Sequence, residues 1–317
     1  MKKKLPILLL GYRRPELTRK VLSAIAQYAP AKLYVSCDGP KPGIASDEVN
    51  VNAVRNLMDN PTWDCEIYRL HRQENLGIRI AITHALDWFF EKEPEGIVLE
   101  DDCVPTEDFF RFAEHCIEKY RHDKKIWGLT GANTAGIRVN DEASYGFVQN
   151  PLIWGWASWA NRWQERDYYL ETFNPGLDLF RKNNWPSRFH KYVFHRHLSS
   201  MIFRGTPNTW DYPWAWTVMS RGGLWIVPNE NQITNVGFGP DGTHIFDDRF
   251  KTPPPKPLGE LVDPVEVVSS MHKEKEILRY IHGLRSPAVF SFVRHWGRRL
   301  LSPGILARRL PVPPLPK

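Results

Sequence analysis

Three consecutive acidic residues, Glu100, Asp101 and Asp102, follow directly on the apolar run Ile97-Val98-Leu99. Such a run is typical of a strand that is buried on both faces of a sheet, and open α/β sheets bind ligands at the carboxyl ends of their strands. Crowded carboxylates repel one another, and a divalent cation with a preference for oxygen relieves that repulsion. The alternative is an acidic N-cap, but the helix expected from about residue 106 has its own acidic residues at its start. The triplet therefore favours a metal or substrate site.

Polar residues also follow the first two expected strands. The first strand ends in Gly11-Tyr12-Arg13-Arg14-Pro15 and the second in Asp38-Gly39-Pro40. An arginine can bind a phosphate through two parallel hydrogen bonds, and an aspartate can accept from a base N–H or a ribose hydroxyl. Each motif alone is compatible with an ordinary turn. Together with the acidic triplet they predict a nucleotide-binding cleft that includes Gly11, Arg13 and Asp38.

A catalytic base has four candidates in the second half of the chain, Asp211, Asp241, Asp247 and Asp248. Asp211 differs from the others because aromatic residues surround it in the sequence Trp-Asp-Tyr-Pro-Trp-Ala-Trp. Apolar neighbours raise the pKa of a carboxylate by desolvation, which suits a group that takes a proton from a hydroxyl. A carboxylate that is paired with a nearby arginine is the alternative interpretation.

Four strand and helix units in succession must position these residues. Strands are expected at 5–11, 33–37, 65–70 and 97–99, and apolar residues at helical spacing follow each of them, after Pro15 and over 46–58, 76–90 and 106–121. Alternating strands and helices predict a mostly parallel α/β sheet with right-handed crossovers. In such a sheet the carboxyl ends of the strands meet at one edge.

The composition describes a folded chain of one large domain or two fused ones. The 317 residues are 42% hydrophobic and 13% aromatic, which excludes a peptide hormone, a disulfide-stapled miniprotein and a disordered chain. The four cysteines have no metal-ligand spacing and indicate a reducing, cytoplasmic compartment. The apolar run after the first lysines is interpreted as a buried strand rather than a signal peptide, and no window holds the roughly 20 apolar residues of a membrane span.

Three regions follow from these patterns. Residues 1–132 form a nucleotide-binding α/β half, and residues 133–251, rich in Trp, Gly, Asn and Pro, form a loop-rich acceptor and catalytic half of the same domain. Residues 252–317 form a tail that begins with a Pro-rich linker at 252–258. The whole net charge of +6 lies in residues 286–317. Helical spacing over 287–301 predicts either an amphipathic helix on the inner, anionic face of a membrane or a helix that packs on the domain.

The order of these motifs resembles the GT-A nucleotide-sugar glycosyltransferases, particularly the N-acetylglucosaminyltransferase I-like group, which has Glu-Asp-Asp in place of Asp-X-Asp. The resemblance runs from about residue 5 to 250. It rests on Val35-Ser36-Cys37-Asp38-Gly39, Asn75-Leu76-Gly77, Val98 to Asp102, Gly155-Trp156, Trp210-Asp211, and Asn235-Val236-Gly237 ahead of Gly242-Thr243-His244. The evidence for the resemblance is the order of these motifs along the chain together with the setting of the acidic triplet between a strand and a helix.

The resemblance implies a GT-A (Rossmann-like) fold and a metal-dependent, inverting transferase. Such an enzyme is of the hexosyltransferase or N-acetylhexosaminyltransferase type. It moves a sugar from a nucleoside-diphosphate sugar, with a UDP-sugar as the expected donor, to a hydroxyl of a glycan or lipid-linked glycan. Reactions of this kind belong to polysaccharide biosynthesis. Residue by residue, it implies that Asp38 binds the base, Glu100 and Asp101 contact ribose and sugar, and Asp102 ligates Mn²⁺ or Mg²⁺. It further implies His244 as a metal ligand or phosphate contact and Asp211 as the catalytic base.

Two further residues are assigned to the donor site, and each also has an ordinary structural explanation. Arg79 could reach the diphosphate, although an arginine on a helix surface is the default. Trp156, with its neighbour Trp154, could form a sugar-facing wall by stacking on pyranose faces, although core packing explains each of them equally well.

Other classes of protein account for less of the sequence. A sugar nucleotidyltransferase would have a Gly-rich basic loop after the first strand, where this chain has Gly11-Tyr12-Arg13-Arg14. A glycosidase needs two carboxyl groups that flank a sugar, but not a nucleotide-type sheet edge. A non-enzymatic protein that binds membranes or nucleic acids would explain the basic tail and leave the triplet unexplained, so no nucleic-acid partner is expected.

Overall fold

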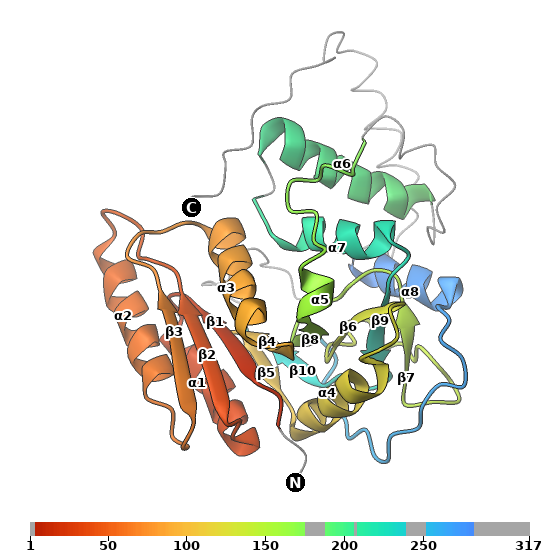
Figure 1. Cartoon of the computed structure of the whole chain (residues 1–317), viewed down its shortest axis with the longest axis horizontal. Helices are drawn as coiled ribbons and strands as arrows, with labels where there is room; N and C mark the ends of the chain where they lie inside the picture. The colour runs from red at the N-terminus through yellow and green to blue at the C-terminus, as the bar shows by residue number, and fades with distance from the viewer. Residues whose placement is uncertain (1–3, 175–187, 206–207, 239–251, 282–317) are drawn as a thin grey trace.

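The computed structural model describes residues 4–174, 188–205, 208–238 and 252–281 of the chain (Figure 1). Its main sheet has eight strands in the order β3-β2-β1-β4-β8-β6-β9-β7. The strands are β1 (Ile7–Gly11), β2 (Lys32–Cys37), β3 (Glu66–His71), β4 (Glu95–Glu100), β6 (Ile126–Thr130), β7 (Tyr145–Val148), β8 (Trp156–Trp159) and β9 (Leu224–Pro228). Only β7 and β8 run against the direction of the other strands of this sheet. The predicted α/β fold with a mostly parallel sheet is confirmed.

The helices of the first half begin and end close to where the sequence predicts them. They are α1 (Pro15–Tyr28), α2 (Ala45–Asp59), α3 (Ile78–Lys92) and α4 (Glu107–Tyr120). Thr106 is the N-cap of α4, since its hydroxyl accepts a hydrogen bond from Phe109 N at 3.2 Å, and two acidic residues occupy the first turn. The acidic triplet therefore lies outside the cap of α4, as the sequence indicated.

Alternate residues of the central strands face two separate layers of helices. In β1, Ile7 and Leu9 pack with apolar residues of α1, α2 and α4, whereas Leu8 and Leu10 pack with those of α3, α7 (Asp211–Ser220) and α8 (Met271–Ile281). All four leucine and isoleucine side chains are buried, and each contributes about 1.5–3 kcal/mol to stability when fully removed from water. This double coverage explains why the strand is a continuous apolar run.

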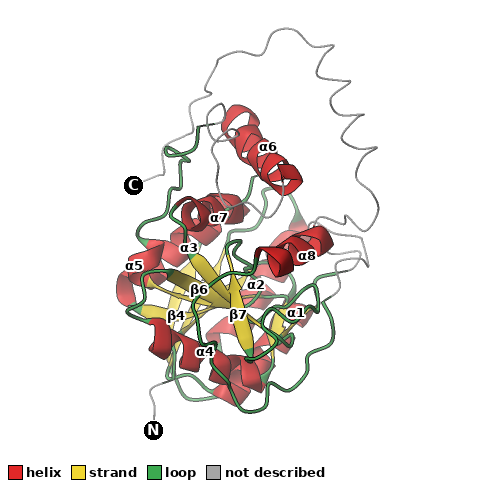
Figure 2. Ribbon diagram, turned by 90° about the vertical axis from the view of Figure 1, so that its right-hand side faces the viewer, coloured by secondary structure: helices red, strands yellow, loops and turns green. Residues whose placement is uncertain are grey.

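The second half of the chain extends the same sheet and adds an outer layer. It contributes β7 to β9, and the helices α5 (Ala160–Trp163), α6 (Arg188–Arg204) and α7 (Asp211–Ser220). Figure 2 shows α6 outside α7, on the side of the strands opposite to α4. Leu198 and Met201 of α6 pack with Ala215 and Trp216 of α7. A second sheet joins β5 (Cys103–Pro105) to β10 (Ile233–Asn235) in antiparallel pairing.

The Pro-rich segment over 252–258 forms no helix or strand, but it is not a free linker. Asn231 Nδ2 donates to Pro253 O at 2.6 Å, Gln232 Nε2 donates to Lys256 O at 2.7 Å, and Leu258 N donates to Asp108 Oδ2 at 2.8 Å. Asn231 and Gln232, which precede β10, and Asp108 of α4 thus hold the backbone of this segment on the domain, and the division of the chain at residue 252 stays a prediction.

The segment leads into α8 (Met271–Ile281), which also packs on the domain through Ile277. The predicted amphipathic helix at 287–301 lies outside the described residues, so its membrane binding stays a prediction. Among the described residues, no helix is long and apolar enough to cross a membrane.

Candidate functional site

The carboxyl ends of three neighbouring strands meet at one edge of the sheet. The parallel pairing of β1 with β4 sets Leu10 beside Glu100, and its pairing with β2 sets Gly11 beside Cys37. Glu100 is the last residue of β4 and Asp38 follows directly on β2. The predicted gathering of the strand ends around the acidic triplet is therefore confirmed.

Arg14, at the start of α1, neutralises two members of the triplet. Its Nη2 atom pairs with Asp101 Oδ1, and its Nη1 atom lies 2.9 Å from Asp102 Oδ2. Tyr12 N donates to the other oxygen of Asp101 at 3.3 Å. Asp101 is buried, and both of its oxygens have partners, so it orients Arg14 and the end of β1. The predicted contact of Asp101 with ribose or sugar stays a prediction.

The third member, Glu100, is not one of the two carboxylates that Arg14 pairs with, and its pKa is raised more strongly than that of Asp101. Burial raises the pKa of Glu100 well above its usual value, the neighbouring carboxylates of Asp102 and Asp101 raise it further, and Arg14 opposes them. Asp211 adds to the rise, which indicates that the two carboxylates act on each other through space.

The small second sheet covers the triplet from the other side. Val236 N donates to Asp102 O at 2.8 Å, directly after the pairing of β10 with β5. A Cβ atom at Gly237 would lie 2.3 Å from Asp102 Oδ2, so only glycine permits this approach of the backbone to the carboxylate. The fold thus brings the sequence motif Asn235-Val236-Gly237 onto Asp102 from a distant part of the chain.

A cavity of about 340 Å³ opens at this edge of the sheet, and we call it the polar cavity. The ends of β1, β2 and β4, the start of α3 and the segment before α7 form its walls. Its charged and amide side chains are Arg13, Arg14, Asp38, Lys41, Asn75, Glu100 and Asn208. Four residues that the sequence assigned to a nucleotide cleft, Gly11, Arg13, Asp38 and Glu100, therefore lie around one cavity.

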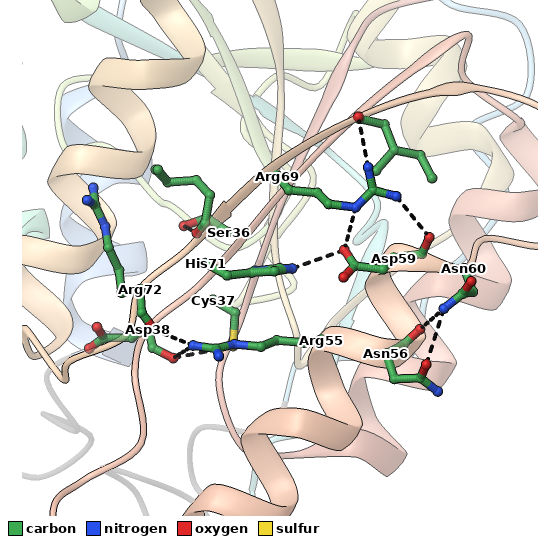
Figure 3. A network of polar contacts seen from close by, with 12 residues as sticks. Ser36, Cys37, Asp38, Arg55, Asn56, Asp59, Asn60, Arg69, His71 and Arg72 are labelled. Carbon is green, nitrogen blue, oxygen red and sulfur yellow. Dashed lines mark hydrogen bonds and ion pairs between the residues drawn. The ribbon is translucent and has the colours of Figure 1, made fainter.

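Asp38 also shapes the wall of the polar cavity. Its carboxylate accepts hydrogen bonds from Gly39 N at 2.9 Å and from Leu76 N and Gly77 N at 3.0 Å each. These bonds hold the turn before α3. Figure 3 shows Arg55 reaching the backbone oxygens of both Asp38 and Arg72, which ties the ends of β2 and β3 together. Base recognition by Asp38 stays a prediction.

Sequence reasoning did not single out a second group at the polar cavity, formed by Tyr12, Asp47 and Asn75. The hydroxyl of Tyr12 donates to Asp47 and accepts from Asn75 Nδ2 at 3.1 Å. Arg13 Nη1 lies 3.1 Å from Asp47 Oδ1, so Asp47 orients two lining residues. Asp47 is buried in α2. A charged residue on the apolar face of the expected helix at 46–58 was the available signal.

Asp211 lies in the wall of a second cavity of about 210 Å³, which we call the apolar cavity. Asp211 is the first residue of α7, and its carboxylate accepts hydrogen bonds from Thr209 Oγ1 and, at 2.9 Å, from Tyr212 N. Most other lining residues are apolar and include Leu152, Trp154, Phe194, Ala215, Met219 and Leu278. Asn208, three residues before Asp211, lines the polar cavity, so one short segment borders both cavities.

Trp156 does not form a sugar-facing wall, and this expectation is corrected. Its side chain is 1% exposed and lies among the rings of Trp163, Trp210, Trp214 and Trp225, with centroid separations of 5.8–6.5 Å. It is core, as the alternative interpretation held. Trp154 instead lines the apolar cavity, and its ring meets Phe238 edge to face at 5.9 Å.

Arg79, in the first turn of α3, contacts a tyrosine of the second half of the chain. Its guanidinium group lies 4.7 Å from the ring centroid of Tyr168, and Nη2 donates to Tyr168 O at 3.0 Å. A contact between Arg79 and a diphosphate stays a prediction. His244 and the three other candidate bases, Asp241, Asp247 and Asp248, lie outside the described residues.

The charge of the triplet suits a divalent cation, but its ligands do not complete a site. Three carboxylates follow one another at the end of β4, and Arg14 pairs with two of them, Asp101 and Asp102. Within the described ranges, however, no three His, Cys, Asp or Glu side chains are grouped so that they could hold a metal ion. An ion at Asp102 would need further ligands from a bound phosphate or from residues such as His244.

No protein-family model matches the sequence, and no curated protein matches it. Solved structures resemble its fold at low identity. UDP-glucose pyrophosphorylase in complex with UDP-glucose is 9% identical over 73% of this chain and 93% of its own, with a TM-score of 0.36. Mouse xyloside xylosyltransferase 1 is 11% identical over 70% and 83%, with a TM-score of 0.36. The bifunctional glycosyltransferase WbbM is 10% identical over 69% and 38%, with a TM-score of 0.29. Such scores say nothing of what this chain binds or transfers.

Proposed function

We propose that the chain is an inverting glycosyltransferase that moves a sugar from a nucleoside-diphosphate sugar to an acceptor hydroxyl. The expected donor is a UDP-sugar. The observation that supports the proposal is that the polar cavity and the apolar cavity, which differ in their lining, are bordered by the same short segment. The polar cavity offers arginine and lysine side chains to phosphates, and the apolar cavity presents the carboxylate of Asp211. One segment, from Asn208 to Asp211, borders both. A donor in the first cavity and an acceptor in the second would meet at this segment.

The residues of the polar cavity support binding and orientation of the donor. Arg13 and Lys41 carry positive charge that favours a diphosphate, and Arg14 stabilises the charge of the two carboxylates beneath it. Asp38 and Asn75 lie at the end of β2 and before α3, where a base would be bound. Glu100, the last residue of β4, lines the same cavity and would hold the sugar.

Asp211 is the base of the proposed reaction. Its carboxylate takes the proton of the acceptor hydroxyl while the hydroxyl oxygen attacks the anomeric carbon. The bond from this carbon to the diphosphate breaks on the opposite side, and the configuration inverts. Thr209 Oγ1 and Tyr212 N hold the carboxylate in place.

Divalent-cation dependence is part of the proposal. Asp102 would hold Mn²⁺ or Mg²⁺ together with phosphate oxygens, and the ion would supply positive charge to the leaving diphosphate. A glycan or lipid-linked glycan acceptor, a role for His244, and attachment of the basic tail to an anionic inner membrane surface rest on the sequence alone.

The test is a panel of UDP-, GDP-, ADP- and dTDP-sugars added to the full chain, with Mn²⁺, with Mg²⁺ and with EDTA. We expect one donor to raise the melting temperature, because a ligand of the native state stabilises it by mass action, and to release nucleoside diphosphate slowly. Formation of pyrophosphate from a nucleoside triphosphate and a sugar phosphate would instead identify a nucleotidyltransferase. Absence of binding by the whole panel would overturn the proposal.

A further inference from the structure

The apolar cavity differs in kind from the polar cavity beside it. Asp211 is the only charged side chain among the described residues that line the apolar cavity. Thr134, Asn150 and Tyr212 are its other polar lining residues, and the remaining nine of thirteen are apolar. Five charged side chains line the polar cavity. The two sides of the junction therefore select for different chemistry.

A fully hydroxylated sugar is poorly matched to such a wall. Each hydroxyl that loses water without gaining a hydrogen-bond partner carries a desolvation penalty, and this cavity offers few partners. An apolar group gains from the same burial in proportion to its area. The volume is sufficient, since an apolar cavity of about 150 Å³ takes up a benzene ring.

Three separate elements build this wall. Leu152 and Trp154 precede β8, Ala215 and Met219 lie on α7, and Leu278 lies on α8. All three elements pack into the body of the domain, α8 through the neighbouring Ile277. The apolar character is thus a property of the folded domain, built next to Asp211.

We propose that the apolar cavity binds an alkyl or aryl group of the acceptor, so that the acceptor is an amphipathic alcohol or glycoside with its hydroxyl at Asp211. This inference rests on the proposed function for the meaning of Asp211. The cavity itself is tested by binding alone, without a donor.

The probes are methyl, n-hexyl and phenyl β-D-glucoside, kept below the concentration at which the hexyl compound forms micelles. Calorimetry and saturation-transfer NMR with the full chain should show hexyl or phenyl glucoside bound at least about tenfold more tightly than methyl glucoside. Preference for hexyl indicates an alkyl acceptor group and preference for phenyl an aryl group. Equal binding of all three, or no binding, would overturn the inference.

Adjacent residues of α8 provide a matched pair of variants. Leu278 lines the cavity, whereas Ile277 is similarly buried and packs in the core without lining the cavity. Leu278→Ala should weaken binding of the preferred probe about fourfold or more, and Ile277→Ala should leave it unchanged. Equal effects of the two variants would place the probe elsewhere and refute the assignment. Tight binding of the apolar probes by a chain that uses no nucleotide sugar would retain the apolar site and refute only the proposed transferase.

Discussion

Arg14 Nη1 lies 2.9 Å from Asp102 Oδ2, while its Nη2 atom pairs with Asp101. One largely buried guanidinium group thus neutralises two carboxylates at the end of β4. The neighbouring Arg13 pairs with Asp47 from a position that is 40% exposed. Two adjacent arginines of the same loop therefore have different consequences for stability.

Arg14→Met should lower the free energy of unfolding by about 3–5 kcal/mol, because it leaves two buried carboxylates without their cation. Arg13→Met is the matched control and should cost about 1 kcal/mol or less, since its ion pair is open to water on one side. Urea unfolding at pH 7 measures both. Equal costs would show that the pairing of Arg14 with the triplet does not stabilise the fold.

Asp211→Asn should lower kcat for sugar transfer by about 10²–10⁴-fold, because the amide cannot take the proton of the acceptor hydroxyl. Donor affinity should change little, since Asp211 lies in the apolar cavity rather than in the polar one. Steady-state kinetics and donor calorimetry separate the two effects. Proton NMR of the product from an α-linked donor should show a β linkage, and an α linkage would remove the role given to Asp211.

Substitution of the two tryptophans on either side of Gly155 should affect different properties, stability for Trp156 and acceptor use for Trp154. Trp156→Ala should cost about 3–5 kcal/mol of unfolding free energy, because it empties the centre of a tryptophan cluster. Trp154→Ala should cost less and should instead weaken acceptor use, since Trp154 lines the apolar cavity. Denaturant unfolding and transfer kinetics test the contrast, which the reverse pattern would contradict.

Asp38→Asn should loosen the turn before α3. In the wild-type protein, backbone N–H groups donate to both oxygens of the Asp38 carboxylate. An asparagine keeps one of these acceptor oxygens but places an amide nitrogen, itself a donor, opposite one of the N–H groups. We expect the free energy of unfolding to fall by about 1–3 kcal/mol and hydrogen exchange at the amides of Leu76 and Gly77 to become faster. Unchanged exchange at both amides would show that Asp38 does not hold this turn.

Glu274 of α8 should make stability depend on pH. Burial raises its pKa to about 7, although hydrogen bonds from Gln149 N and Asn150 N oppose the rise. Because the pKa in the folded state lies above the unfolded value, this group favours folding below about pH 4.5, and that contribution is lost as the pH rises through 7. In Glu274→Gln the loss of stability between these pH values should be smaller by about 3 kcal/mol. Parallel pH profiles of variant and parent would contradict this.

The alternation of strands and helices over the first 121 residues and the gathering of polar residues at one sheet edge follow from the sequence by itself. Continuous apolar runs and helical spacing are local signals, and the carboxyl ends of parallel strands must lie at the same edge. The α/β fold and the grouping of Gly11, Arg13, Asp38 and Glu100 around one cavity follow from these signals alone.

Only the tertiary structure decided which of two residues of the same type, close together in the sequence, contributes to a site and which has a structural role. Gly155 has a φ of +59°, and this left-handed turn before β8 separates Trp154 at a cavity from Trp156 in the core, although strand alternation would put both on one face. Arg14, rather than Arg13, meets the acidic triplet because of how the chain turns from β1 into α1. The apolar cavity joins residues from segments as distant as Ala132 and Leu278. Such long-range contacts depend on packing of the whole domain, which no local pattern encodes.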